Sequence, residues 1–372
     1  MTKKINILHL TYDMGIGGTE QVILQLIKYT DESVFNNSVV CIEGKIGAIG
    51  EKLKTTGTDF HLFNRQPGFD INLIKSVRQV LLKNEIDIVH CHQYTPYVYG
   101  VLAALTCKSK VVFTEHGRFY PDRYSWKRRV INPFLGLVTH SIIAISAATK
   151  NALAEYEWFA KNSIQVIYNG IQSAAPVSSD QKRTELGLLP EHTVFGTITR
   201  FDPIKNLPMM IEAFSSVYKQ DNKARLLLVG DGEERQSLEQ LVSQLGIKDA
   251  VIFTGFQTDT AVYMSLIDVY VLSSFSEGTS MTLLEAMSMS TCCVVTNVGG
   301  NVEIITDQSN GFIVESDNVP ALSETMQLLL NDTDLRYRTG NSAKDTFDQK
   351  FDLHLMIQRY RQTYLKVLGQ DK

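Results

Sequence analysis

The chain has 372 residues, of which 44% are hydrophobic and 20% charged, and its net charge is −4. At roughly 100–200 residues per domain, this length predicts two domains with substantial cores, which excludes a wholly disordered chain. A nucleic-acid-binding domain usually carries a marked positive charge, so we expect no nucleic-acid partner.

The length of the apolar segments and the spacing of the cysteines indicate the cellular compartment. No apolar run approaches the roughly 18–20 residues of a membrane span, and the first one meets Asp13 before a signal-peptide core is complete. The cysteines are not spaced like a zinc or redox motif, and they favour a reduced compartment: Cys41, Cys91, Cys107, Cys292 and Cys293. The sequence therefore predicts a cytoplasmic protein.

In the first half, short apolar runs alternate with amphipathic stretches, a pattern typical of a parallel sheet flanked by helices. The predicted strands are Ile5–Leu10, Ser38–Ile42, Phe60–Phe63, Ile86–His90, Lys110–Thr114, Ser141–Ile145 and Ile164–Tyr168.

The second half repeats the pattern, with helices predicted at Leu207–Tyr218 and Glu233–Leu245. Its predicted strands are Val194–Thr199, Arg225–Val229, Ala250–Phe253, Val269–Leu272, Cys292–Thr296 and Gly311–Val314.

These patterns predict an α/β protein of two doubly wound Rossmann-like domains that face each other across a cleft. We expect an N-terminal domain at 1–172, a linker at 173–190, a C-terminal domain at 191–352, and a helix within 353–372 that packs across the domain junction. Through Ala175 the chain has 19 Lys and Arg against 14 Asp and Glu, a balance of +5, which leaves −9 for the rest. The two domains therefore have different electrostatic neighbours.

Two candidate sites follow strands in the first half. Gly17 and Gly18 stand where the first strand enters a helix, and their backbone N–H groups suit an anionic ligand. The alternative is a plain turn capped by Thr19 or Glu20. His116 follows another strand, where an imidazole can donate to a substrate oxygen or move a proton, although a lone histidine is usually structural.

A basic and aromatic segment follows His116. Lysine and arginine beside tryptophan suit an anionic membrane surface, and a solvated helix face is the alternative. The residues concerned are Arg118, Arg123, Trp126, Lys127, Arg128 and Arg129.

In the second half, Arg200 and Lys205 follow a predicted strand, and two cations on one loop can grip a diphosphate. Glu277 and Glu285 flank a glycine-led helix entry whose backbone donors can meet phosphate: Gly278, Thr279, Ser280 and Met281. The alternative is a capping box in which Glu285 pairs with Thr282.

A further loop after a predicted strand contains Gly299, Gly300 and Asn301. It is expected to offer another set of open backbone donors.

Taken together, these motifs resemble the family 4 retaining glycosyltransferases of GT-B fold, over nearly the whole chain. The matching elements are Gly17-Gly18-Thr19-Glu20 for G-G-x-E, His116-Gly117 for H-G, Asn169-Gly170-Ile171 before the linker, Arg200 and Lys205 for R-x4-K, and the pair Glu277 and Glu285. The sequence departs from the family at Gln172, where aspartate is usual, and at Ser290-Thr291-Cys292, where Gly-x-Pro is common.

The resemblance implies a metal-independent hexosyl- or N-acetylhexosaminyl-transferase without a cofactor, which uses a nucleotide-sugar donor, most commonly a UDP-sugar. Arg200 and Lys205 would hold the diphosphate with the helix start at Thr279–Met281. Glu285 would accept from the ribose, Glu277 and His116 would contact the sugar, and Gly17-Gly18 would close over diphosphate or acceptor.

The implied acceptor is a glycan or lipid-linked sugar in cell-surface polysaccharide or lipopolysaccharide synthesis, reached from the inner face of the cell membrane. Two alternatives stay open: a non-hydrolysing sugar-nucleotide epimerase, and a non-catalytic glycan- or nucleotide-binding protein of the same fold. Asp332-Thr-Asp334 is interpreted as an incidental D-x-D string.

Overall fold

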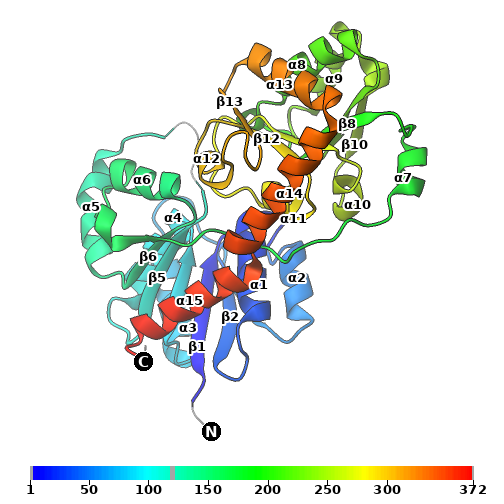
Figure 1. Cartoon of the computed structure of the whole chain (residues 1–372). Helices are drawn as coiled ribbons and strands as arrows, with labels where there is room; N and C mark the ends of the chain where they lie inside the picture. Colours follow the sequence, from blue (N-terminus) through cyan, green and yellow to red (C-terminus); the bar gives the residue numbers. More distant parts are fainter. Residues whose placement is uncertain (1–2, 118–121, 371–372) are drawn as a thin grey trace. The chain divides into compact units, whose positions relative to one another are not determined.

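The computed structural model describes residues 3–117 and 122–370, which fold into two compact units (Figure 1). Unit 1 comprises Met1–Asn169 and Leu353–Lys372, and unit 2 comprises Gly170–Asp352. The segment predicted as a linker belongs to unit 2 and contains helix α7 (Asp180–Glu185). The C-terminal helix belongs to unit 1. Each unit is described below by itself.

Unit 1 contains a sheet of seven parallel strands in the order β3-β2-β1-β4-β5-β6-β7. The order reverses between β1 and β4, which is the topological switch point of a Rossmann-like domain. The strands are β1 (Ile5–Thr11), β2 (Phe35–Cys41), β3 (Asp59–Leu62), β4 (Ile88–His92), β5 (Lys110–Glu115), β6 (Ser141–Ala144) and β7 (Ile164–Val166).

Helices cover both faces of this sheet, since its strands are apolar on both sides. One hydrophobic cluster joins Leu8, Val89 and Phe113 to the helices α3 to α6, and another joins Ile7, Ile88 and Val112 to α1 and α15. The helices are α1 (Gly18–Tyr29), α2 (Ala48–Lys54), α3 (Ile71–Lys83), α4 (Tyr94–Ala104), α5 (Trp126–Leu137), α6 (Ala147–Tyr156) and α15 (Leu353–Val367).

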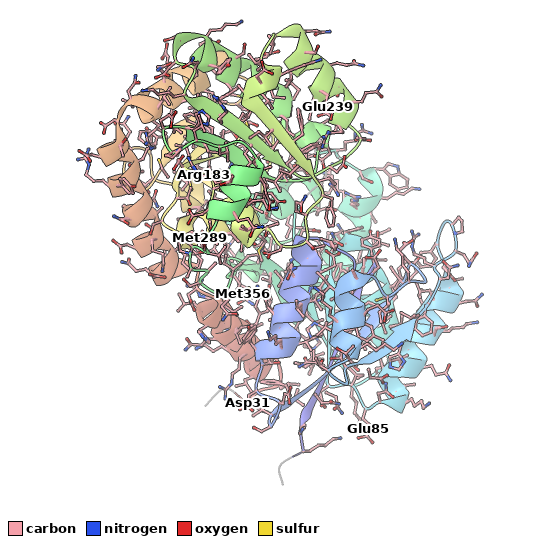
Figure 2. All side chains as sticks on the ribbon, turned by 90° about the vertical axis from the view of Figure 1, so that its right-hand side faces the viewer. Asp31, Glu85, Arg183, Glu239, Met289 and Met356 are labelled. Atoms are coloured by element: carbon pink, nitrogen blue, oxygen red, sulfur yellow. The ribbon has the colours of Figure 1, made fainter. Side chains whose placement is uncertain are left out.

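The C-terminal helix α15 completes the core of unit 1. Met356, Tyr360 and Tyr364 are buried against the β1, β4 and β5 side chains named above, and Met356 is labelled in Figure 2. The helix is therefore part of this unit's core although it lies at the other end of the sequence.

Unit 2 contains six parallel strands in the order β10-β9-β8-β11-β12-β13, with the reversal between β8 and β11. The strands are β8 (Thr193–Ile198), β9 (Ala224–Val229), β10 (Val251–Gly255), β11 (Val269–Leu272), β12 (Cys292–Thr296) and β13 (Phe312–Val314). The main helices are α8 (Leu207–Gln220), α9 (Arg235–Gln244), α10 (Ala261–Met264), α11 (Met281–Ser288), α12 (Asn301–Ile304), α13 (Val319–Asn331) and α14 (Thr333–Lys350).

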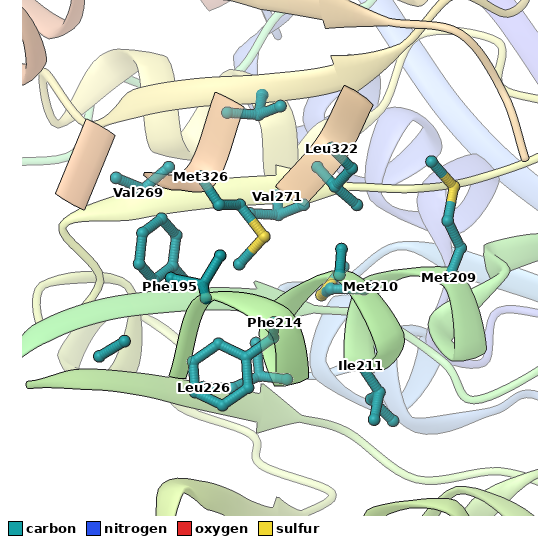
Figure 3. Packing of buried hydrophobic residues seen from close by; sticks show 14 of the residues in the cluster. Phe195, Met209, Met210, Ile211, Phe214, Leu226, Val269, Val271, Leu322 and Met326 are labelled. Carbon is teal, nitrogen blue, oxygen red and sulfur yellow. The ribbon is translucent and has the colours of Figure 1, made fainter. Parts of the chain in front are cut away.

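The core of unit 2 lies between the sheet and the helices α8 and α13 (Figure 3). Phe195, Phe214 and Met326 are each fully buried there. Their interdigitation anchors strand β8 and helix α8, and so fixes the loop between them.

All thirteen predicted strands are present, with ends displaced by three residues at most. One displacement matters for the site, because β4 runs to His92 instead of ending at His90. Of the described helices, none combines the length and the apolar character needed to span a membrane.

Candidate functional site

The unit 2 candidates lie in two loops that follow neighbouring strands. Arg200 and Lys205 come after β8, and Glu277 comes after β11, which pairs with β8 in parallel through Val269 and Phe195. Both loops therefore leave the carboxyl edge of the sheet at its topological switch point, the usual ligand position in such a sheet.

Lys205 and Glu277 form an ion pair. The Lys205 Nζ lies 2.7 Å from Glu277 Oε1, and Ser274 Oγ donates to the same oxygen at 2.6 Å. The two side chains are only 21% and 9% exposed. Ser273 Oγ also donates to the Lys205 carbonyl at 2.9 Å. Ser273 thus holds the Lys205 backbone, and the shielded Glu277 carboxylate holds its ammonium. The ammonium is therefore fixed before any ligand arrives.

Arg200 is not held in this way. Its side chain is 78% exposed and pairs with Asp202 at 2.6 Å. The guanidinium faces solvent, although the Asp202 carboxylate is only 13% exposed, so a phosphate can compete with Asp202 for the guanidinium donors. The structure therefore brings Lys205 and Glu277 together and places Arg200 on Asp202.

Helix α11 begins beside this pair in sequence, and its cap differs from the alternative given above. Ser280 is the N-cap, and its hydroxyl accepts from the Leu283 N–H at 3.4 Å, whereas Thr282 Oγ1 lies 2.6 Å from Tyr270 Oη. The capping-box interpretation of Thr282 and Glu285 is therefore wrong.

The residues of this helix entry differ in exposure. Thr279 and Ser280 are buried, and Gly278 and Met281 are half-buried. Glu285 is half-buried in the second turn, and its burial raises the pKa of the carboxyl to about 7. A half-buried carboxyl with such a pKa, near the start of a helix that follows a strand, is a candidate ligand-binding group.

In the loop after β12, two of the three expected backbone donors already have partners within the protein. The Gly300 N–H donates to the Glu277 carbonyl at 3.0 Å, and the Asn301 N–H donates to the Val298 carbonyl at 3.1 Å. Gly299 has φ of +50°, and a Cβ there would lie 2.0 Å from the Glu277 carbonyl oxygen. The loop is therefore a support for the backbone of Glu277.

Gly299→Ala is expected to lower activity at least tenfold and to destabilise unit 2 by about 1–3 kcal/mol, because the new methyl overlaps Glu277. Gly246→Ala is the matched control, since Gly246 has φ of +71° with open space around it. Chemical denaturation and initial rates check both variants. Equal effects of the two substitutions would contradict a role for Gly299 in placing Glu277.

In unit 1, the glycine loop lies at the start of α1. Gly17 is the N-cap with extended backbone, and Gly18 is the first helical residue, so neither Thr19 nor Glu20 takes the cap position expected in the alternative. A Cβ on Gly17 would lie 2.4 Å from Glu20 Oε2, so the glycine makes room for that carboxylate. Burial raises the pKa of Glu20.

His116 follows β5 and is half-buried. Its Nε2 lies 2.8 Å from His92 Nδ1, whereas its buried Nδ1 has no hydrogen-bond partner among residues 3–117 and 122–370. Burial lowers the pKa of His116 to about 3, so the ring is neutral at physiological pH. His92 was not predicted as a site residue, although the His90-Cys91-His92 alternation near a strand end was the available signal.

The D-x-D string has a structural explanation. The Asp332 carboxylate is the N-cap of α14 and accepts from the Leu335 N–H at 2.8 Å.

Two family descriptions match the chain in succession. "Glycosyltransferase Family 4" matches residues 16–174, and "Glycosyl transferases group 1" matches residues 178–346. Together they include all the candidate site residues discussed above.

Curated relatives match over most of their length. N-acetyl-alpha-D-glucosaminyl L-malate synthase of Bacillus anthracis is 27% identical over 82% of this chain and 81% of its own. UDP-Gal:alpha-D-GlcNAc-diphosphoundecaprenol alpha-1,3-galactosyltransferase of Escherichia coli is 24% identical, with 98% of each chain covered.

Solved structures show the same fold. A glycosyltransferase from Rickettsia africae has a TM-score of 0.86 at 20% identity, covering 98% of this chain and 99% of the other. Anabaena HepE in complex with UDP has a TM-score of 0.85 at 23% identity, covering 98% and 100%. The two Rossmann-like domains and the GT-B fold expected from the sequence are confirmed.

Proposed function

Because the chain belongs to glycosyltransferase family 4, we propose that it moves a hexosyl or N-acetylhexosaminyl group from a UDP-sugar to a glycan or lipid-linked acceptor, with retention of the anomeric configuration. The names of the relatives support the choice of substrates. The Escherichia coli enzyme takes UDP-Gal and a diphosphoundecaprenol-linked sugar, and HepE has been solved with UDP.

The observation that carries the proposal is the shielded Lys205–Glu277 pair at the switch point of unit 2. Cleavage of the bond between the anomeric carbon and the diphosphate oxygen leaves negative charge on the diphosphate. The fixed ammonium of Lys205, the exposed guanidinium of Arg200 and the N-terminus of α11 are suited to stabilise that charge. The acceptor hydroxyl forms the new bond on the same face, and its proton passes to the leaving diphosphate.

The same groups support the expectation that neither metal nor cofactor is needed, because cations and helix dipoles can take over the charge neutralisation that a metal supplies elsewhere. Turnover is therefore expected to persist in EDTA. Loss of turnover in EDTA with recovery on addition of Mg²⁺ or Mn²⁺ would contradict this part of the proposal.

The proposal is tested by a panel of nucleotide sugars, with release of free nucleotide measured for wild type and Lys205→Met in the presence and absence of candidate acceptors. One donor consumed by wild type and spared by the variant supports the proposal. Conversion of a donor to its epimer indicates the epimerase, and tight nucleotide binding without turnover of any donor indicates a binding protein; either result would contradict the proposal.

We further propose that helix α5 docks unit 1 on an anionic membrane. Trp126, Val130, Phe134 and Leu137 are all exposed, and at 100° per residue they fall within about 80° of one another around the helix. The opposite side is anchored through the buried Asn132 and Leu135. An exposed apolar stripe of this kind suits the boundary between headgroups and acyl chains.

The basic residues predicted for this surface divide into two groups. Arg123, Lys127 and Arg129 are exposed beside the stripe, as anionic headgroups require. Arg128 instead donates to the buried Glu157 at 2.5 Å and lies over the Tyr94 ring, so it stabilises the fold of unit 1. Arg118 lies outside the described residues.

Phe134→Ser is expected to weaken binding to vesicles of anionic lipid about tenfold or more, because burial of a phenyl ring in lipid contributes about 1.5–3 kcal/mol. Phe256→Ser is the matched control, since Phe256 is 56% exposed in unit 2 and Phe134 is 67% exposed in unit 1. Vesicle sedimentation measures both variants, with donor hydrolysis unchanged in each. Equal binding by the two variants would contradict the assignment of α5.

A further inference from the structure

Three histidines form a continuous chain of hydrogen bonds across the sheet of unit 1. His9 Nδ1 lies 3.1 Å from His92 Nε2, and His92 Nδ1 lies 2.8 Å from His116 Nε2. His9 stands on β1 and His92 on β4, and both are fully buried, while His116 follows β5 at the carboxyl edge of the sheet. The far end of the chain is Asn37 on β2, whose Oδ1 lies 3.1 Å from His9 Nε2.

The donor and the acceptor of each of these hydrogen bonds follow from the contacts of Asn37. Thr30 Oγ1 lies 2.7 Å from the Leu26 carbonyl oxygen, and since the carbonyl has no proton, the threonine hydroxyl donates there. The Asn37 amide group must then be the donor in its 3.0 Å contact with Thr30 Oγ1. This orients Asn37 with its carbonyl oxygen toward His9, so that His9 Nε2–H donates to it.

The protonated nitrogen of each ring determines which nitrogen is protonated in the next ring, because all three rings are neutral. Burial lowers the pKa of His9 to about 4 and that of His116 to about 3, and it lowers the pKa of His92 well below the ordinary value. A neutral imidazole carries one N–H. His9 Nδ1 therefore accepts from His92 Nε2–H, and His92 Nδ1 accepts from His116 Nε2–H.

The chain of hydrogen bonds ends at the lone pair of His116 Nδ1. With its proton on Nε2, His116 presents Nδ1 as an acceptor, and this buried atom has no partner in the part of the chain that the structure describes. A buried acceptor without a donor is unfavourable, and a bound ligand with a hydroxyl group would satisfy it.

A metal ion is the competing explanation for these histidines, because ring nitrogens of His9, His90 and His92 lie within 4.8 Å of one another. The hydrogen bonds argue against it. His90 places Nδ1 2.8 Å from Tyr364 Oη and Nε2 2.8 Å from Thr114 Oγ1, and the facing nitrogens of His9 and His92 already share a proton. Among the described residues, the cluster is thus complete without an ion.

We propose that Asn37, His9 and His92 are positioning residues that lock His116 as its Nε2–H tautomer, so that Nδ1 accepts a hydrogen bond from a sugar hydroxyl of the substrate. The choice of a sugar hydroxyl rests on the proposed function, whereas the tautomer does not. A phosphate oxygen has no proton to give, so the locked ring favours the sugar over the diphosphate.

The tautomer is measured directly by 15N NMR of protein labelled at histidine, at neutral pH. The signals lost in His116→Gln are those of His116. The inference expects a protonated Nε2 and an unprotonated Nδ1 in wild type. A protonated Nδ1, or a doubly protonated ring, would overturn it, whatever the enzyme transfers.

Two substitutions at the far end of the chain test the lock. Asn37→Leu removes the acceptor for His9, so the His116 ring should become a mixture of tautomers, with kcat/KM about three- to tenfold lower and UDP affinity unchanged. Asn37→Asp keeps an acceptor at that position and should retain the wild-type tautomer and rate. Asn36→Leu is the matched control, because Asn36 is the neighbouring residue of β2, is exposed, and binds Asn6.

The outcomes separate the two proposals. If NMR shows the expected tautomers but the protein turns over no nucleotide sugar, the positioning of His116 is supported and the proposed function is refuted. If the wild type transfers sugar but Asn37→Leu has the same His116 tautomer as the wild type, the positioning role of Asn37 is refuted and the proposed function stands.

Discussion

Replacing Lys205 with methionine is expected to lower kcat about 10²–10³-fold, the usual effect of removing one fixed group that stabilises developing negative charge. The ammonium is held 2.7 Å from Glu277 Oε1 before the donor binds, so it needs no reorganisation when the diphosphate leaves. Methionine keeps the length and apolar stem of the side chain and removes only the charge. Initial rates under donor saturation measure the effect.

A loss of rate could also come from the unpaired Glu277 carboxylate, which is costly to leave shielded from water. The double variant Lys205→Met with Glu277→Gln removes both charges, and we expect it to regain stability without regaining activity. Lys182→Met serves as a control, because Lys182 pairs with Glu185 within helix α7 and is not one of the candidate site residues. A double variant that recovered the wild-type rate would contradict the role of Lys205 at the leaving group.

Replacing Glu285 with glutamine is expected to have opposite effects on binding and on stability. If its carboxylate accepts from the ribose hydroxyls, the variant binds UDP at least tenfold more weakly, since hydrogen bonds to charged groups contribute about 1.5–3 kcal/mol. At pH 8 the same variant should unfold at a higher temperature, because wild type then holds a buried charge.

The pH dependence follows from the sign of the pKa shift. Burial raises the pKa of Glu285 from 4.5 to about 7 in the folded protein. Between these values the unfolded chain has already lost the proton that the folded one keeps, so wild-type stability falls as pH rises, by on the order of 3 kcal/mol in total. Below pH 4.5 this contribution is fully present, and above pH 7 it is lost.

Calorimetry from pH 4 to pH 8 and UDP titration at each pH check these expectations. The gain in stability of Glu285→Gln should appear above about pH 5, and wild-type UDP affinity should rise as the carboxyl ionises near pH 7. Glu239→Gln is the control, since Glu239 lies on the surface helix α9 (Figure 2). UDP affinity that is unchanged in Glu285→Gln would contradict the ribose assignment.

The strands were predictable from the sequence because each is a short apolar run between polar turns. Strand ends were less predictable, and the extension of β4 to His92 shows why. Histidine reads as polar in a pattern, yet here the ring is buried and paired with two other rings. A polar residue whose partners come from distant strands cannot be placed by local periodicity.

For the site, the sequence predicted which residues take part but not which of them contact one another. The motifs located Lys205 and Glu277 in loops after strands and Glu285 in the helix that follows, but spacing gave no sign that Lys205 pairs with Glu277 or that Arg200 pairs with Asp202. The donors at Gly300 and Asn301 were misinterpreted as open because the sequence of a glycine-rich loop indicates only its conformational freedom. Whether their N–H groups bind a ligand or the protein's own Glu277 depends on the tertiary fold.

The most direct test of glycosyl transfer by this chain is a product measurement. Wild-type protein is incubated with UDP-sugars and a diphosphopolyprenyl-linked sugar, and the acceptor is examined by mass spectrometry and NMR. We expect a gain of one hexose or N-acetylhexosamine in the α-configuration of the donor, which is lost in Lys205→Met. A product of inverted configuration, or transfer that survives undiminished in Lys205→Met, would contradict the assignment of the donor site and its chemistry.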